Sequence, residues 1–262
     1  MSKVYVITGS TSGIGKALLE EYSKENTVFA GYRNENLKPE GRNIIPFYID
    51  YTKPETIKPA IDFIKSKTDR IDTIINAAGC VVAGAIDNIS LQDLKRQFDV
   101  NVFGAIELTG GLDVKKIINI SSMSSFGIYP FIAPYCASKR ALDILFNLWG
   151  LESGKQVISL KLGAVATPIW SKSIKENEKS LSDVSGYEKE YDYLVKNALK
   201  NETKGMPVSK IVKKVIEIDN KQKPKPSYTI GFDAKAAELF SHLPQTLINH
   251  VIENKLKSMR KD

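Results

Sequence analysis

The chain has few cysteines and lacks both a long apolar run and a linker rich in proline and glycine. No segment of its 262 residues approaches the run of about 20 apolar residues that spans a membrane, so we expect no transmembrane helix. The apolar run Val4–Ile7 follows almost directly on Met1, so we expect no export signal. Two cysteines, Cys80 and Cys136, cannot form a framework of several disulfides. We therefore expect a reducing compartment, the cytoplasm.

The chain also carries little excess charge of either sign. Thirty-seven Lys and Arg oppose thirty Asp and Glu, which gives a net charge of +7. Basic and acidic residues are interleaved over most of the sequence, and only 255–261 is locally basic. This pattern predicts a solvated surface and no nucleic-acid partner. With 42% hydrophobic residues and no low-complexity tract, the composition predicts a single domain over 1–262.

Apolar, β-branched runs alternate with helical patterns along the chain. Between the runs, apolar residues recur at helical spacing, as at Ile57, Ile61 and Ile64. The alternation predicts an α/β fold, a doubly wound parallel sheet with helices on both faces. Seven runs are predicted to be strands: Val4–Ile7, Thr27–Ala30, Ile44–Ile49, Thr73–Ile75, Lys116–Ile120, Val157–Leu162 and Tyr228–Ile230.

The pattern loosens after Thr167 into a polar, lysine-rich stretch. We expect residues 169–206 to form a substrate loop, with a plain surface excursion as the alternative. Residues 207–262 are expected to cap the sheet and to end in an amphipathic helix. We expect the apolar stripe of this helix to pack on the core, with contact to a membrane surface as the alternative. The stripe consists of Leu243, Leu247, Val251 and Leu256.

A glycine-rich turn follows the first predicted strand. Residues Thr8–Lys16 read Thr-Gly-Ser-Thr-Ser-Gly-Ile-Gly-Lys and lead into a predicted helix. Unpaired N–H groups and the helix dipole favour an anion at such a turn, and glycines let the backbone approach a pyrophosphate. The spacing Gly-x-x-x-Gly-x-Gly departs from the commoner Gly-x-Gly-x-x-Gly. The turn predicts a dinucleotide site that includes Gly9, Ser12, Gly13 and Gly15.

The end of the second predicted strand bears on the choice between NADP and NAD. A carboxylate at this point binds the ribose 2′-hydroxyl of NAD, whereas an arginine accommodates a 2′-phosphate. Here residues 30–34 read Ala-Gly-Tyr-Arg-Asn, and no acid precedes Glu35. Because a guanidinium binds phosphate well, Arg33 predicts NADP(H) in preference to NAD(H). The alternative is that Arg33 points into solvent.

Tyr135 and Lys139 lie four residues apart in a predicted helix and share one face. A free tyrosine has a pKa of about 10 and is a poor base at neutral pH. A lysine cation at about 4 Å, with an effective dielectric constant near ~20, stabilises the phenolate by about 4 kcal/mol. We therefore predict that Lys139 lowers the pKa of Tyr135 and that the pair performs general acid–base catalysis.

These motifs resemble the short-chain dehydrogenase/reductase family over almost the whole chain. Thr8–Gly15 matches its Thr-Gly-x-x-x-Gly-x-Gly, Asn76–Gly79 its Asn-x-Ala-Gly strand end, and Tyr135–Lys139 its Tyr-x-x-x-Lys. Asp99–Asn101 resembles the segment with a helix asparagine, and Ile120–Ser122 the strand end with a serine. The resemblance implies a Rossmann fold, no metal, and hydride transfer between nicotinamide and a carbonyl or secondary alcohol carbon.

The resemblance also implies a role for each matching side chain. Tyr135 exchanges a proton with the substrate oxygen, Lys139 binds the nicotinamide ribose, and Ser122 hydrogen-bonds the substrate oxygen. Asn101 holds a water that links the lysine to solvent. Ser122 is chosen among several serines because it precedes Tyr135 by thirteen positions, the usual family spacing. The structural alternatives are that Asn101 bends its helix and that the serines cap the following turn.

The family pattern implies further contacts with the cofactor. The adenine is expected near Asp50, and the carboxamide of the nicotinamide near Val165 and Thr167. The family's proline before Gly163 is missing here, so we expect a less rigid backbone in that segment. The residues that the resemblance places at the cofactor are Ile14, Asp50, Asn76, Ala77, Ala78, Gly79, Tyr135, Lys139, Val165 and Thr167.

Substrate and assembly are indicated less directly. Residues 225–244 resemble the retinol and hydroxysteroid dehydrogenase branch, which favours a bulky apolar alcohol or ketone, with a plain sheet cap as the alternative. The family implies a homodimer or homotetramer, although the helix that normally packs in the dimer is trimmed near Gly110–Gly111. Two other functions are kept: an NAD-dependent alcohol dehydrogenase on the same site, and a non-catalytic dinucleotide-sensing regulatory protein.

Overall fold

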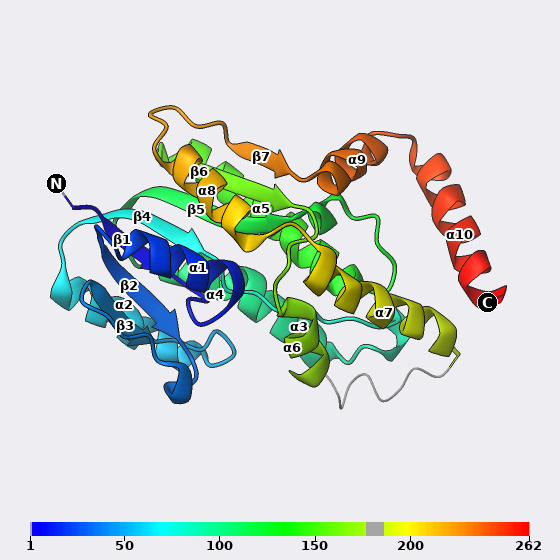
Figure 1. Ribbon diagram of the computed structural model, residues 1–262, viewed down its shortest axis with the longest axis horizontal. Helices are drawn as coiled ribbons and strands as arrows, with labels where there is room; N and C mark the ends of the chain where they lie inside the picture. Colours follow the sequence, from blue (N-terminus) through cyan, green and yellow to red (C-terminus); the bar gives the residue numbers. More distant parts are fainter. Residues whose placement is uncertain (1, 177–185, 262) are drawn as a thin grey trace.

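The computed structural model describes residues 2–176 and 186–261 (Figure 1). These residues contain one parallel seven-stranded sheet with the order β3-β2-β1-β4-β5-β6-β7. The order reverses between β1 and β4, so the crevice for a ligand is expected at their carboxyl ends. The strands are β1 (Val4–Ile7), β2 (Thr27–Tyr32), β3 (Ile44–Tyr48), β4 (Ile71–Asn76), β5 (Val114–Ser122), β6 (Gln156–Leu162) and β7 (Ser227–Ile230).

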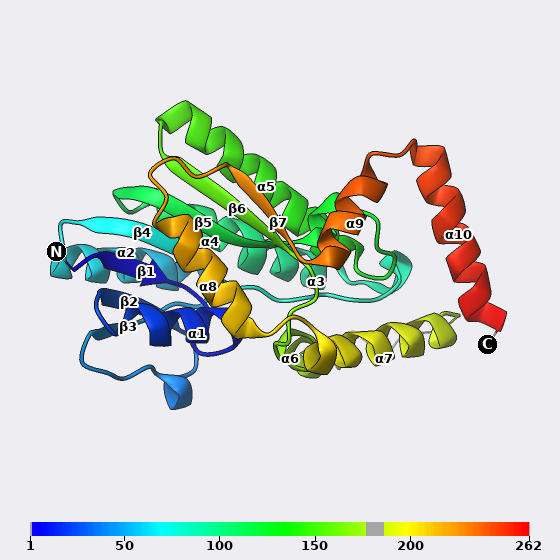
Figure 2. The same cartoon turned by 45° about the horizontal axis from the view of Figure 1, so that its top comes forward.

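Helices cover both faces of the sheet (Figures 1 and 2). One hydrophobic core lies under α1 and α8, and the other lies under α2, α4 and α5. A π-helical turn, η4 (Asp99–Phe103), joins α3 to α4. The helices are α1 (Gly13–Tyr22), α2 (Ile57–Lys67), α3 (Leu91–Phe98), α4 (Gly104–Gly110), α5 (Ala133–Ser153), α6 (Ile169–Glu176), α7 (Glu188–Lys204), α8 (Val208–Asp219), α9 (Phe232–Ser241) and α10 (Gln245–Lys261).

The central strands are mainly apolar because both of their faces are buried, although β4 and β5 also bury the polar residues Thr73 and Asn119. In β5, Ile117 packs in the core of α2, α4 and α5, while its neighbour Ile118 packs in the core of α1 and α8. The predicted α/β fold with a parallel sheet is confirmed, and each of the seven predicted strands is present. The strands differ from the predictions mainly in length: β2 continues beyond Ala30 to Tyr32, and β5 extends the predicted Lys116–Ile120 to Val114–Ser122.

The C-terminal third differs from the sequence predictions. Within the predicted substrate loop, residues 169–206, Ile169–Glu176 form α6 and Glu188–Lys204 form α7, and residues 177–185 lie outside the described residues. The prediction that the last apolar stripe packs on the core is wrong, because Leu247 and Val251 are each 45% exposed. α10 contacts α7 instead, and its buried residue is Ile248, at 3% exposure. Within 2–176 and 186–261, no helix combines the length and the apolar character that crossing a bilayer requires.

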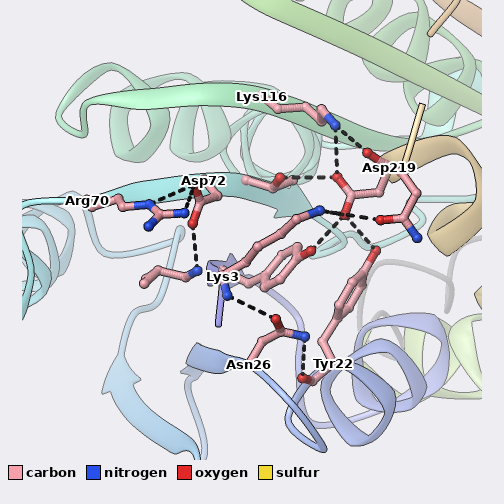
Figure 3. A network of polar contacts seen from close by, with 11 residues as sticks. Lys3, Tyr22, Asn26, Arg70, Asp72, Lys116 and Asp219 are labelled. Atoms are coloured by element: carbon pink, nitrogen blue, oxygen red, sulfur yellow. Dashed lines mark hydrogen bonds and ion pairs between the residues drawn. The ribbon is translucent and has the colours of Figure 1, made fainter. Parts of the chain in front are cut away.

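A buried carboxylate fixes the end of α8 to the amino edge of the sheet (Figure 3). Asp219 accepts hydrogen bonds from the hydroxyls of Tyr5 at 2.7 Å and Thr73 at 3.2 Å. The Lys116 ammonium lies 3.2 Å from the same carboxylate and also donates to the backbone carbonyl of Asp219. Burial and the Asp219 charge raise the pKa of Tyr5 well above its usual range. Strands β1, β4 and β5 thus meet α8 at one ionic contact.

Candidate active site

The turn between β1 and α1 has a shape that requires glycine. Gly9 has a φ of +64°, and a Cβ there would lie 2.8 Å from the Ala78 backbone. A Cβ on Gly15 would collide with the carbonyl oxygen of Gly9. The Thr8 hydroxyl accepts hydrogen bonds from the N–H groups of Ala77 and Ala78, both at 3.2 Å. These contacts hold the turn against the end of β4.

This turn opens on a cavity of about 520 Å³ at the carboxyl ends of the strands. In the described part of the chain, the Ser12 side chain does not cap α1, so the first N–H groups of the helix are available to an anion. The cavity extends from Arg33 and Asp50 at one end to Tyr135 and Lys139 at the other. A glycine cradle followed by a long crevice fits a dinucleotide.

Most of the predicted site residues line this cavity. Gly15 does not, because its role is to let α1 approach the turn. Asn76 does not line it either, and its side chain donates to Asn119 of β5 at 2.9 Å. The predicted residues that line the cavity are Gly9, Ser12, Gly13, Ile14, Arg33, Asp50, Ala77, Ala78, Gly79, Ser122, Tyr135, Lys139, Val165 and Thr167.

Three of the four predicted catalytic side chains, those of Ser122, Tyr135 and Lys139, line the same cavity, and Asn101 does not. Tyr135 and Lys139 lie in the first turns of α5 and are 7% and 4% exposed. The Lys139 ammonium lies 5.8 Å from the centre of the Tyr135 ring and donates to the carbonyl of Ile120 at 2.9 Å. Ser122 ends β5 and lines the same cavity, and, against the larger rise caused by burial, its hydroxyl acts to lower the pKa of Tyr135. This hydroxyl also accepts a hydrogen bond from the N–H of Ser124 at 3.1 Å, so the capping alternative is confirmed, and the catalytic role of Ser122 stays a prediction.

Burial sets the proton affinities of this pair. Loss of hydration raises the pKa of Tyr135 to about 12, and the hydrogen bond with Ser122 opposes the rise. Loss of hydration also lowers the pKa of Lys139 to about 8, and the charge of Asp143 opposes that fall. The prediction of a lowered tyrosine pKa is wrong here, because desolvation dominates. At neutral pH both side chains carry their proton, so Tyr135 is ready to act as an acid.

Asn101 is buried in the π-helical turn η4, in agreement with the helix-bending alternative. Its side-chain oxygen accepts the N–H of Cys80 at 2.9 Å. Its side-chain nitrogen donates to the Cys80 carbonyl at 3.1 Å and to the Ser138 hydroxyl at 3.0 Å. Asn101 therefore joins the segment after β4 to α5. Its water-holding role stays a prediction.

The segment after β6 is held firmly although it lacks the proline of the family pattern. The carboxylate of Asp233, at the start of α9, accepts the N–H of Ala164 at 2.7 Å. Ala164 and Ala166 also exchange backbone hydrogen bonds with Met206, at 2.8 and 3.0 Å. The expected loss of rigidity is thus compensated from the C-terminal region, next to Val165.

Three residues at the site were missed by the sequence analysis: Gln97, Trp170 and Ser173. The Trp170 ring lies 6.5 Å from the Tyr135 ring, and both Trp170 and Ser173 line the cavity from α6. Gln97 is buried and binds the backbone after β4. Gln97 could have been recognised because it is a polar residue one helical turn before Asn101. The polar stretch after Thr167 offers no comparable signal for the other two.

Known proteins share this arrangement. A profile of the short chain dehydrogenase family matches residues 3–178. An uncharacterized oxidoreductase of Bacillus subtilis (strain 168), YusZ, is 26% identical over 98% of this chain and 99% of its own. An NADPH-dependent 3-dehydrocapnine reductase of Ornithobacterium rhinotracheale is 26% identical over 98% of each chain.

A solved structure of the same family has a similar fold. The crystal structure of a short-chain dehydrogenase from Streptomyces avermitilis superposes with a TM-score of 0.72 at 20% identity, over 100% of this chain and 98% of the other. The family profile covers most of the sequence, and the nucleotide cradle and the Ser122–Tyr135–Lys139 cluster lie in one cavity. The chain belongs to the short-chain dehydrogenase/reductase family, oxidoreductases that bind a nicotinamide dinucleotide and act on CH–OH and C=O groups.

Proposed function

We propose that this protein is an NADP(H)-dependent reductase of a carbonyl compound, with Tyr135 as the proton donor. One observation carries the proposal: Ser122, Tyr135 and Lys139 line the same cavity as the glycine turn. The protonated state of Tyr135 supports reduction as the direction, because reduction needs an acid at the substrate oxygen. The NADPH-dependent relative supports the choice of cofactor.

The chain's own residues would bind the cofactor along the cavity. The N–H groups at the start of α1 would hold the pyrophosphate, and Arg33 would hold the 2′-phosphate. Lys139 would hold the nicotinamide ribose, and Val165 and Thr167 the carboxamide. Bound there, the nicotinamide supplies the hydride.

Acid catalysis at the substrate oxygen follows from three side chains. Tyr135 gives its proton to the oxygen as negative charge develops there. The Ser122 hydroxyl donates a hydrogen bond to the same oxygen and stabilises that charge. The positive charge of Lys139 then stabilises the tyrosinate, which is otherwise disfavoured by burial. Reversal of these steps would oxidise a secondary alcohol.

An apolar substrate fits the surroundings of Tyr135. Val81, Ile132, Tyr135 and Cys136 form a buried cluster against which Trp170 packs. Polar groups on a substrate would lose their hydration here without a partner, at a cost of about 1–3 kcal/mol each. We therefore propose an apolar ketone or aldehyde as the substrate class.

A carbonyl screen tests the proposed function. The protein is mixed with NADPH and a panel of aliphatic, cyclic and aromatic carbonyls, and the loss of NADPH absorbance is followed. We expect turnover of at least one apolar ketone or aldehyde, and faster turnover than with NADH. Tight binding of NADPH without turnover of any carbonyl would instead favour a dinucleotide-sensing protein.

Arg33→Ala is expected to weaken NADPH binding about 10- to 100-fold and to leave NADH binding unchanged. Loss of charge-assisted hydrogen bonds to a phosphate costs about 1.5–3 kcal/mol, and only NADPH carries the 2′-phosphate. Fluorescence titration of both nucleotides measures the effect. Arg42→Ala removes a second exposed arginine that does not line the cavity within the described residues, and serves as the matched control. Equal affinities for the two nucleotides in the wild type would contradict the preference for NADP.

Lys139 is expected to set the alkaline limit of the reaction. Carbonyl reduction should proceed at constant kcat/KM at lower pH and decline as pH rises through about 8, where Lys139 loses its proton. Tyr135 keeps its proton over this range, because its pKa is about 12. The pH profile of kcat/KM measures the free enzyme's groups.

Asp143→Asn should move this decline to lower pH. Asp143 is buried one helical turn after Lys139, and no hydrogen-bond partner for its carboxylate lies among the described residues. Its charge raises the pKa of Lys139, so its removal lets burial lower that pKa further. A decline at the same pH in the variant, or a flat wild-type profile, would contradict the assignment to Lys139.

A further inference from the structure

The segment Cys80–Val82 leaves β4, and its backbone is held by side chains instead of a neighbouring strand. The N–H groups of its three residues, in order, donate to Asn101 Oδ1 at 2.9 Å, Ser173 Oγ at 3.1 Å and Gln97 Oε1 at 2.6 Å. Gln97 Nε2 also donates to a carbonyl of the segment at 2.9 Å. Asn101 and Gln97 belong to the same helical unit, α3–η4, whereas Ser173 belongs to α6.

This segment forms the cavity wall beside the catalytic pair. Cys80 and Val81 line the cavity together with Tyr135 and Lys139. A Cβ added to the preceding residue, Gly79, would lie 3.6 Å from the Lys139 ammonium. A movement of the wall relative to α6 would therefore change the width of the site at the point where the proton is transferred.

The helix α6 carries the other side of the substrate region. Its residues Ile169 and Trp170 line the cavity, and the Trp170 ring lies 6.5 Å from the Tyr135 ring. At its start, the N–H of Ser171 donates to Glu202 of α7 at 2.7 Å, which anchors α6 to the outer helix. The contact toward the catalytic wall is the Ser173–Val81 hydrogen bond, and both of these residues are buried.

We propose that Ser173 is a positioning residue: its hydroxyl fixes α6 to the Cys80–Val82 wall and so sets where Trp170 holds the substrate relative to Tyr135. This inference rests on the proposed function. Without the hydroxyl, the buried N–H of Val81 loses its acceptor, and α6 shifts or admits water to satisfy that donor. The groups proposed to hold the pyrophosphate and the 2′-phosphate belong to other segments, the start of α1 and Arg33, so the change is expected to act on the substrate more than on the dinucleotide.

Ser173→Ala tests the inference by a split between kinetic constants. We expect KM for the best carbonyl from the screen to rise about tenfold or more, with kcat changed far less and the Kd for NADPH unchanged. Ser173→Thr keeps the hydroxyl and should restore most of the wild-type KM. Ser171→Ala is the matched control in the same helix, because the Ser171 hydroxyl donates to Pro168 in an exposed position.

Hydrogen–deuterium exchange gives a readout that does not depend on turnover. The Val81 amide should exchange faster in Ser173→Ala than in the wild type or in Ser171→Ala. Should the alanine variant not fold, Ser173→Cys replaces it, since a thiol is a weaker acceptor. Unchanged Val81 exchange, or faster exchange with an unchanged KM, would overturn the inference. No turnover in the wild type would overturn the proposed function. Unchanged Val81 exchange in Ser173→Ala would overturn the role of Ser173 whether or not the wild type turns over a carbonyl.

Discussion

Tyr135→Phe is expected to lower kcat for carbonyl reduction by about 10²–10⁴-fold while leaving the affinity for NADPH close to that of the wild type. The change removes the hydroxyl that donates the proton. It keeps the ring, which is buried in the apolar cluster of Val81, Ile132 and Cys136. The packing around the site is therefore preserved, and the effect is confined to the chemical step. Steady-state kinetics and fluorescence titration of NADPH measure the two quantities separately.

Tyr129→Phe is a suitable control for this prediction. Burial also raises the pKa of Tyr129 to about 12, and its ring packs against the same apolar cluster as Tyr135. Within the described residues, however, Tyr129 does not line the cavity. We expect removal of the Tyr129 hydroxyl in Tyr129→Phe to leave kcat nearly unchanged. Activity retained in Tyr135→Phe would place the proton donor elsewhere. A joint loss of turnover and NADPH affinity would indicate a structural effect rather than a chemical one.

The features that the sequence predicts well are those with a local physical cause. A strand buried on both faces is mainly apolar, so a run such as Val4–Ile7 could be recognised without knowledge of its neighbours. The glycine turn is equally local, because a side chain at Gly15 would collide with the carbonyl oxygen of Gly9 in the same turn. Spacing along α5 likewise places Tyr135 and Lys139 on one face.

The features that the sequence did not predict depend on segments far apart in the chain. The pKa of Tyr135 is set first by burial, to which residues from the wall after β4 and from α6 contribute. Four-residue spacing carries no information about that burial, so the predicted direction was wrong. For the same reason Ser173 could not be recognised. Its importance comes from the backbone of Val81, which is distant in sequence.

The C-terminal helix shows a second limit of sequence patterns. Apolar residues of α10 lie on more than one face, and helical spacing alone does not tell which face is covered. Leu247 and Ile248 are adjacent, yet they are 45% and 3% exposed. The structure places α10 against α7 (Figure 2). Which face an amphipathic helix buries is decided by the partner helix and not by the stripe.

Asp219→Ala is expected to lower the free energy of unfolding by about 3–5 kcal/mol, the cost of breaking a buried ion pair. The change leaves the Lys116 ammonium without its carboxylate and the hydroxyls of Tyr5 and Thr73 without an acceptor (Figure 3). Natural domains unfold with about 5–15 kcal/mol, so the loss is a large fraction of the total. Urea denaturation followed by circular dichroism measures it.

Glu217→Ala in the same helix is the matched control. Glu217 forms ion pairs with Lys214 at 2.7 Å and with Lys221, just after α8, at 3.2 Å, and all three side chains are exposed to solvent. Such surface pairs are screened by water, so the midpoint of unfolding should move little. The folded Asp219→Ala protein should keep its activity, because the network lies at the amino edge of the sheet and the cavity at the carboxyl edge. Equal, small effects of both substitutions would show that Asp219 is not what fixes α8 to the sheet.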